Sequence, residues 1–198
     1  MSRIIRTLAF LGCLMAVSPA SAFVMGEDGL HKEDWFTITF RDIAEDIEQA
    51  KSEGKRLAIT FEQRGCIYCR EMHEKILADP EVRDYISDNF MVVQYNMFGD
   101  EEVTDLDGEV LTEKTAARKW GYVFTPTIVF LPEDVPESKT VAEAAVSTMP
   151  GAFGKLTFLN MFKWVREKGY EGDQHFQHYH ADIVNRLRAE GKLGDGED

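Results

Sequence analysis

Two cysteines separated by two residues stand where a strongly apolar segment gives way to a helical one, and this feature restricts the possible folds most. Residues 56–62, RLAITFE, are apolar and partly β-branched, which predicts a buried strand. The segment that follows, CREMHEKIL from Cys69, is typical of a helix. Cys66 therefore falls between a strand and a helix. From spacing alone the pair is a redox-active disulfide, a structural disulfide or half of a metal site.

The position of Cys66 favours reactive sulfur. The N-terminus of a helix presents free N–H groups and the positive end of the helix dipole. A thiolate there is stabilised and can act as a nucleophile at neutral pH. Cys69 returns one helical turn later, within disulfide distance. We therefore predict that Cys66 is the more exposed, attacking thiol and that Cys69 is the resolving thiol.

Helical and extended patterns alternate along the rest of the chain. Beyond the cysteine pair, the sequence predicts helices over residues 42–55, 79–90, 112–121, 153–169 and 181–190. It predicts strands over residues 90–96, 122–131 and 145–151, a short hairpin over residues 103–111 and a polar loop over residues 132–142. Such alternation indicates an α/β fold, in which a mixed central sheet is covered by helices on both faces.

The predicted strand at residues 122–131 contains a proline, Pro126, which cannot donate a hydrogen bond to a neighbouring strand. A cis peptide bond before Pro126 would turn the backbone of Thr125 toward solvent, where it could pair with an extended substrate. Cis bonds occur almost entirely before proline. After a C-x-x-C pair in an alternating fold, we expect a cis bond here.

The N-terminus has the pattern of a secretory signal peptide. Arg3 and Arg6 precede an apolar run over residues 8–17, and small residues stand at Ala20 and Ala22. The run is shorter than the roughly 20 residues that a membrane-spanning helix needs. We therefore expect export, cleavage after Ala22 and a periplasmic location. A competing interpretation makes Cys13 an acylated N-terminus.

Export would change the counts of charged residues and cysteines. The first 22 residues hold two of the 22 basic residues and none of the 35 acidic ones, so the mature net charge is 20 minus 35, or −15. This acidity argues against nucleic acid as a partner, because phosphate binding requires clustered Lys and Arg. Only Cys66 and Cys69 would remain, too few for a structural framework in a domain of this size. We expect one domain over residues 23–190 and a disordered acidic tail over residues 191–198.

The motif Cys66-Ile67-Tyr68-Cys69, followed some sixty residues later by Thr125-Pro126-Thr127, resembles the thioredoxin superfamily. More narrowly, the runs TFEQRGCIYCREMH, LADPEVRDYISDNFMVVQYN and MPGAFGKLTFLNMFKWVREKGY resemble the SoxW-type periplasmic thioredoxins. This resemblance implies a thioredoxin fold and thiol–disulfide exchange without a cofactor. It also implies a disulfide-bearing exported partner in sulfur oxidation or cytochrome maturation, and electrons from a membrane thiol carrier. We expect a monomer in which Thr125, Pro126, Ile67 and Tyr68 dock the substrate.

The chain departs from ordinary thioredoxins at several positions. Gly65 replaces the usual tryptophan, Ile67-Tyr68 replaces Gly-Pro, and Thr60 stands where a buried aspartate is usual. Glu62 is therefore our candidate for accepting the Cys69 proton, with an exposed or salt-bridged glutamate as the alternative. His73, seven residues after Cys66, is predicted to lie on the surface.

Two alternatives remain open. A structural disulfide would close a very small loop and stabilise the chain little. A metal-delivery or redox-sensing protein would use the cysteines as copper or zinc ligands, and the cluster His175, His178 and His180 could contribute or bind metal alone. We predict no metal site, and we expect these histidines on a solvated turn before the last helix.

Overall fold

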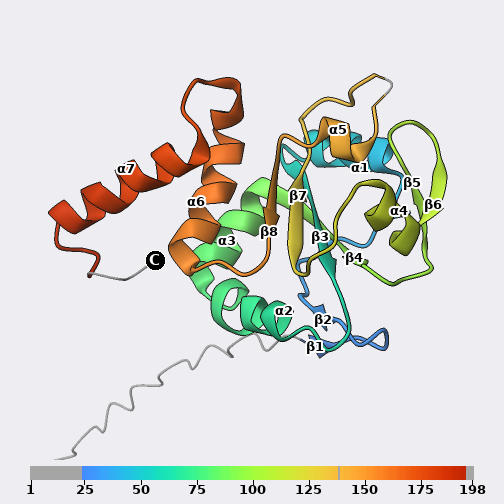
Figure 1. Cartoon of the computed structure of the whole chain (residues 1–198), viewed down its shortest axis with the longest axis horizontal. Helices are drawn as coiled ribbons and strands as arrows, with labels where there is room; N and C mark the ends of the chain where they lie inside the picture. The colour runs from blue at the N-terminus through green and yellow to red at the C-terminus, as the bar shows by residue number, and fades with distance from the viewer. Residues whose placement is uncertain (1–23, 138, 195–198) are drawn as a thin grey trace, which may run out of the picture.

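The computed structural model describes residues 24–137 and 139–194, and it shows a mixed central sheet with helices on both faces (Figure 1). The predicted signal peptide and the end of the predicted tail, residues 195–198, lie outside the described residues. The sheet contains four strands in the order β4-β3-β7-β8. Their bounds are Arg56–Glu62 for β3, Phe90–Asn96 for β4, Thr127–Phe130 for β7 and Ser147–Pro150 for β8. β3 runs parallel to β4 and antiparallel to β7, and β8 is antiparallel to β7. The predicted fold class is confirmed.

Strand alternation divides the core into two layers. Leu57, Ile59 and Phe61 of β3 point to one face of the sheet, where a first apolar cluster lies. The helices packed there are α1 (Ile43–Ser52), α4 (Glu113–Lys119) and α5 (Val141–Ala144). Ala58 belongs to the cluster on the opposite face. The helices packed on the opposite face are α3 (Pro80–Asn89) and α6 (Lys155–Arg166), together with the π-helix η1 (Met72–Leu77).

Two helix starts that the sequence predicts have the expected caps. The Asp79 side chain accepts hydrogen bonds from the backbone N–H groups of Glu81 and Val82 at the start of α3. Thr112 caps α4, and its side chain and that of Thr115 form a reciprocal capping box. Short polar side chains before an apolar periodic run therefore located these helices correctly.

The smaller strands lie outside the central sheet. β5 (Glu102–Thr104) and β6 (Val110–Thr112) form the predicted hairpin, in which Gly108 has a φ of +83°. β1 (Val24–Met25) pairs with β2 (His31–Lys32) near the N-terminus. None of the helices in residues 24–137 and 139–194 is long and apolar enough to span a membrane.

Three predicted boundaries are wrong. The strand predicted over residues 122–131 forms only over Thr127–Phe130, after the proline. The loop predicted over residues 132–142 ends in α5, which begins at Val141 with Thr140 as its cap. The last helix, α7 (Phe176–Ala189), begins five residues earlier than the predicted Ala181. Its first turn is anchored by Phe176, whose ring lies 5.9 Å from that of Trp164. The 3-10 turn η2 (Gly169–Glu171) joins α6 to α7, which extends away from the sheet in Figure 1. The domain boundaries after residues 22 and 190 stay predictions.

Candidate active site

The cysteine pair forms a disulfide at the point where β3 leads into α2 (Ile67–Glu71). Cys66 is the N-cap of α2, and its Sγ accepts a hydrogen bond from the backbone N–H of Cys69 at 3.0 Å. The two Cα atoms are 5.2 Å apart. Gly65 has a φ of +73°, so the turn into the helix uses a conformation that other residues rarely adopt. Cys66 is 7% exposed to solvent, and Cys69 is fully buried. A partner disulfide can therefore reach only Cys66 directly.

The loop before β7 lies against Cys66. The Thr125–Pro126 bond is cis, as predicted. The carbonyl oxygen of Thr125 lies 3.6 Å from the Sγ atom of Cys66, and the Thr125 hydroxyl donates to the same sulfur at 3.5 Å. The carbonyl of Pro126 accepts from the backbone N–H of Gly151 at 2.7 Å, which ties the loop to the segment after β8. Residues 59 positions apart in sequence thus form one site.

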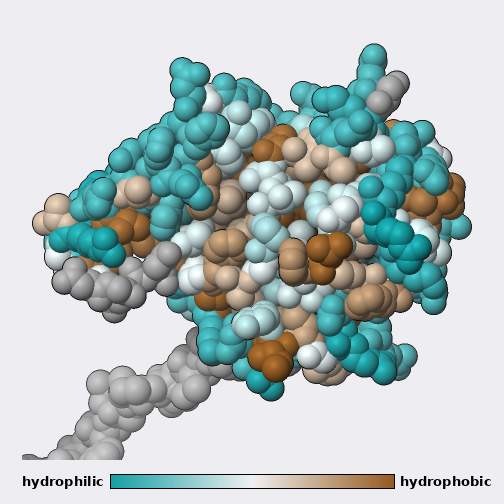
Figure 2. Space-filling view, viewed as in Figure 1, coloured by the Kyte–Doolittle hydropathy of each residue, from teal (hydrophilic) through white to brown (hydrophobic). Residues whose placement is uncertain are grey.

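Apolar side chains surround the disulfide at the surface. Ile67 and Tyr68 are more than half exposed, as are Val123 and Phe124 in the segment before Pro126. Figure 2 shows apolar side chains reaching this face of the molecule, including the region of α2. Large exposed apolar side chains that gather at one place are typical of a contact surface.

A cavity of about 190 Å³ lies beside Pro126, and no sequence pattern predicts it. It is bounded on one side by the helical segment after the cysteines, through Met72 and Ile76. Phe153, from the segment after β8, and Phe158 of α6 form the other side. Its size and mainly apolar lining suit a single side chain of a bound peptide.

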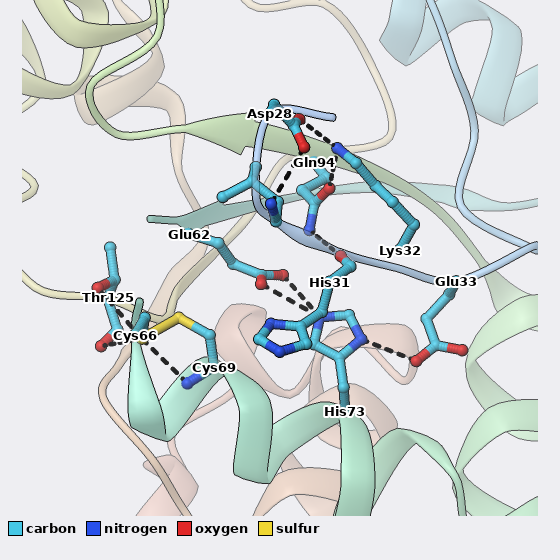
Figure 3. Close-up of polar contacts among 11 residues, drawn as sticks. Asp28, His31, Lys32, Glu33, Glu62, Cys66, Cys69, His73, Gln94 and Thr125 are labelled. Atoms are coloured by element: carbon cyan, nitrogen blue, oxygen red, sulfur yellow. Dashed lines mark hydrogen bonds and ion pairs between the residues drawn. A yellow bond between two sulfur atoms is a disulfide. The ribbon is translucent and has the colours of Figure 1, made fainter. Parts of the chain in front are cut away.

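A buried cluster of charged side chains lies behind the disulfide (Figure 3). The Nε2 atom of His73 is 3.1 Å from both carboxylate oxygens of Glu62, and its Nδ1 atom is 2.7 Å from Glu33. The side chains of His73 and Glu62 are fully buried, and that of Glu33 is 5% exposed. The prediction that His73 lies on the surface is therefore wrong. Glu62 is salt-bridged, as the alternative interpretation held, but inside the protein.

The charge on His73 follows from its partners. Burial alone would lower the pKa of His73, but the hydrogen bonds that its ring donates to Glu33 and Glu62 outweigh burial and raise the pKa to about 9. The ring of His31 stacks on that of His73, with centroids 5.4 Å apart. Burial and the neighbouring charge of His73 lower the pKa of His31. At neutral pH, His73 is an imidazolium beside a neutral His31.

Comparison with known families matches residues 43–144, just over half of the chain, to the thioredoxin-like domain. The chain belongs to the thioredoxin-like family. A thioredoxin-fold protein from Helicobacter pylori aligns with a TM-score of 0.53 at 18% identity, covering 71% of this chain and 87% of that one. A Thermus thermophilus thioredoxin aligns with a TM-score of 0.49 at 23% identity, covering 65% and 86%. The C-terminal domain of Neisseria meningitidis DsbD aligns with a TM-score of 0.42 at 16% identity, covering 64% and 97%. None of the curated proteins matches the chain significantly.

Family membership and the Cys66–Cys69 disulfide together identify this thioredoxin-like protein as a thiol–disulfide oxidoreductase. The cysteines exchange a disulfide for two thiols. Thr60, in the usual place of the buried aspartate, has a buried hydroxyl with no hydrogen-bond partner among the described residues. Of Thr60 and Glu62, the two β3 residues compared with the usual aspartate, only Glu62 carries a carboxyl group.

The sequence did contain a signal for His73. Counted from Cys69 instead of Cys66, His73 is four residues further along the helix and so lies on the same face as a buried cysteine. Glu33 gave no such signal, because its contact with His73 spans 40 residues of sequence. A local pattern cannot predict such a contact.

The three C-terminal histidines are not gathered with the cysteines. His175 is the N-cap of α7, and His178 and His180 lie within the helix instead of on the predicted turn. The ring of His180 contacts the side chains of Thr157 and Asn160 on α6. In Figure 1, α7 extends to the left of the sheet, whereas α2 lies below it. Among residues 24–137 and 139–194, no group of three or more His, Cys, Asp or Glu side chains is arranged to hold a metal ion.

Proposed function

We propose that this thioredoxin-like protein reduces disulfides of exported partner proteins. The thiolate of Cys66 attacks one sulfur of the partner disulfide, which forms a mixed disulfide and releases the other partner sulfur as a thiolate. Cys69 then loses its proton and attacks Cys66. The second partner sulfur leaves as a thiolate, so the partner gains two electrons and Cys66–Cys69 becomes oxidised.

The contact between Cys66 and Thr125 is the observation that carries this proposal. The Thr125 carbonyl lies 3.6 Å from the sulfur of Cys66, the only residue of the pair with any exposed surface. An extended partner segment that pairs with this backbone would bring its disulfide to Cys66. The apolar side chains of Ile67 and Tyr68 add contact area around the same sulfur.

The charges behind Cys69 support the direction of electron flow. Oxidants such as DsbA are strong because their reduced form, with its thiolate, is stabilised. Here the one imidazolium near the cysteines is bound on both sides by glutamate side chains, so it is not free to stabilise a cysteine thiolate. Neither Ile67 nor Tyr68, between the cysteines, supplies a positive charge. These features favour a reductant.

The partner and the electron donor are proposed from the resemblance to SoxW-type proteins. We propose that a membrane thiol carrier re-reduces Cys66–Cys69, and that the partner acts in sulfur oxidation or cytochrome maturation. No nucleic acid is involved, and the protein acts as a monomer. A covalent complex trapped by Cys69→Ser in cells would identify the partner. Recovery of only cytoplasmic proteins would contradict this assignment.

We also propose that the protein works in the periplasm after cleavage at Ala22. The support is the pattern of the N-terminal 22 residues. The full-length chain expressed in a Gram-negative bacterium should appear in the periplasmic fraction, with a mass that begins at Phe23. A cytoplasmic product that retains Met1 would contradict the proposal.

The activity is tested by reduction of insulin, a model protein disulfide, with dithiothreitol as the electron source. The wild-type protein should accelerate precipitation of the insulin B chain. Cys66→Ser should fall to the uncatalysed rate, because no attacking thiolate remains. Cys69→Ser should form a stable mixed disulfide and turn over poorly.

Cys13→Ser, made in the full-length chain, is the matched control. Cys13 lies within the predicted signal peptide, so the exported variant should match the wild type. Catalysis by Cys66→Ser at the wild-type rate would overturn the assignment of the attacking thiol. No catalysis by wild type would overturn the proposed function itself.

A further inference from the structure

Burying the cluster of Glu33, Glu62 and His73 carries a desolvation penalty, and the fold alone does not require this cluster. Isolated charges are rarely buried, because removing them from water costs several kcal/mol per ion, by order of magnitude. Here the three side chains are almost completely enclosed, and they come from three separate parts of the chain. Glu33 follows β2, Glu62 ends β3 and His73 lies in η1. A π-helical segment such as η1 is often found at a functional site.

The cluster lies directly behind the resolving cysteine. His73 is four residues after Cys69, so the two side chains share one face of the helical segment and neighbour each other across one turn. Both are buried. In the view of Figure 3, the Glu62 carboxylate projects from β3 between the turn that bears the disulfide and the His73 ring. Because His73 shares its helical face with Cys69, the carboxylate that binds His73 lies on the same side of the helical segment as Cys69.

We propose that His73 and Glu33 are positioning residues that hold Glu62 as a carboxylate behind Cys69, where Glu62 accepts the Cys69 proton in the resolving step. This inference rests on the proposed function and deepens it. His73 binds both oxygens of Glu62 at 3.1 Å, which fixes the orientation of the carboxylate. Glu33 fixes the opposite edge of the imidazole ring at 2.7 Å.

The reason that Glu62 needs a partner is electrostatic. A fully buried carboxyl group without a counter-charge takes up a proton, and it can then no longer act as a base. An imidazolium in contact favours the charged form. The second carboxylate, Glu33, helps keep His73 protonated, so the imidazolium persists above neutral pH.

The resolving step balances with these groups alone. Starting from the mixed disulfide, the proton of the Cys69 thiol passes to the Glu62 carboxylate. The resulting sulfur anion attacks Cys66, the Cys66–Cys69 bond forms, and the bond from Cys66 to the partner sulfur breaks. The electron pair leaves with the partner thiolate, and Glu62 later returns its proton to solvent.

The other titratable groups near the cluster do not replace Glu62. His31 stacks on His73 from the β2 side and is neutral at pH 7, because burial and the His73 charge lower its pKa. Arg70 and Glu74 lie on the same helical segment as His73 but are exposed and face each other at 3.9 Å. Glu62 is thus the fully buried carboxyl side chain that contacts the internal cation on the helical face of Cys69.

Two variants change the charge around Glu62 in opposite ways, and this makes the test specific. His73→Gln removes the cation but leaves a side chain that can donate a hydrogen bond to Glu62. Glu33→Gln removes a negative charge and leaves the cation. If the cluster acts through Glu62, the first change makes its carboxylate harder to form and the second makes it easier. A general loss of packing would not separate the two variants by sign.

The experiment follows the reduced, full-length mature protein reacting with 5,5′-dithiobis(2-nitrobenzoate) in a stopped-flow instrument between pH 4 and pH 10. Attack by Cys66 releases one coloured thiolate in a first phase. Resolution by Cys69 releases a second thiolate in a slower phase. The midpoint of the pH profile of the second phase is the quantity compared, and the first phase reports Cys66 chemistry alone.

We expect His73→Gln to move the second-phase midpoint upward by about 1–3 pH units, the range for removal of an adjacent opposite charge. The second phase at pH 7 should slow about tenfold or more, with the first phase unchanged. Glu33→Gln should move the midpoint downward. Glu74→Gln, which removes an exposed carboxylate next to His73 in sequence, is the matched control and should leave the midpoint in place.

The outcomes separate this inference from the proposed function. Shifts of the two variants in the same direction, or no shift in either, would overturn the roles of His73 and Glu33 while leaving disulfide reduction intact. If His73→Gln does not fold, an unmoved or raised midpoint in Glu33→Gln overturns them, and a lowered one supports them. Failure of wild type to reduce insulin would instead overturn the proposed function.

Discussion

His73 combines burial with a positive charge, and this links the stability of the folded protein to pH. The pKa of a histidine in an unfolded chain is near 6.5. In the folded protein burial lowers the pKa of His73, but the hydrogen bonds that His73 donates to Glu33 and Glu62 outweigh burial and raise the pKa to about 9. The folded state therefore binds the proton more tightly than the unfolded state. The stabilisation is complete below pH 6.5 and is lost as the pH rises through 9.

We predict that the free energy of unfolding of the oxidised protein falls as the pH is raised from 6.5 to 9.5. The upper limit of the fall is about 3 kcal/mol, from about 1.4 kcal/mol for each pKa unit. Urea unfolding at the two pH values measures it. The double variant Glu33→Gln, Glu62→Gln leaves His73 with neutral partners and should remove the fall. Stability in wild type that is constant or rises over this range would contradict a charged His73.

At the level of single residues, the sequence allowed the cysteines and their neighbours to be predicted but not their buried partners. Cys66, Cys69 and Pro126 are recognisable because local patterns carry them. His73 was wrongly predicted to lie on the surface, because its spacing along the helix was counted from Cys66 and not from the buried Cys69. Glu33 could not be predicted, because its contact with His73 joins segments 40 residues apart.

At the scale of helices and strands, the start of α3 shows how strongly one side chain can define an element. Asp79 accepts two backbone hydrogen bonds and also binds the Lys155 ammonium group at 2.8 Å. The hydrogen bond from Lys155 lowers the pKa of Asp79, although partial burial opposes it. The side chain thus joins the starts of α3 and α6.

We predict that Asp79→Ala lowers the free energy of unfolding by about 1 kcal/mol, the usual cost of removing an N-cap. The exposed contact with Lys155 should add little. Asp79→Asn is the matched control, because an asparagine keeps the cap without the charge, and it should retain most of the stability. Urea unfolding at pH 7 measures both variants. Equal losses in the two would show that the ion pair, and not the cap, stabilises this junction.

The elements that the sequence located well are those with local signals. Runs of apolar residues correctly predicted β3 and β4, and capping residues correctly predicted the starts of α3 and α4. The start of α7 was misplaced because Phe176 packs against Trp164, a tertiary contact that no local pattern reveals. The π-helical turns of η1 were also missed, since their sequence has ordinary helix composition.

For the molecule as a whole, the alternating order of helices and strands was enough to predict a mixed sheet with two covered faces. It did not predict that the N-terminal residues before α1 reach the active-site helix. Through Glu33 and His31 this segment contacts His73, so the N-terminal segment packs against the helical segment that follows the cysteines. The exchange chemistry and the buried charges therefore belong to a single unit.

The reduction potential of the Cys66–Cys69 pair tests the central claim most directly. The mature protein is equilibrated with glutathione or dithiothreitol buffers of known ratio, and the fraction reduced is counted by thiol labelling. A reductant whose thiolate is not stabilised by the buried His73 should have a potential of about −250 mV or lower, close to that of thioredoxin. A potential above about −150 mV, toward that of DsbA, would show that the protein is an oxidant and would contradict the direction of electron flow proposed for it.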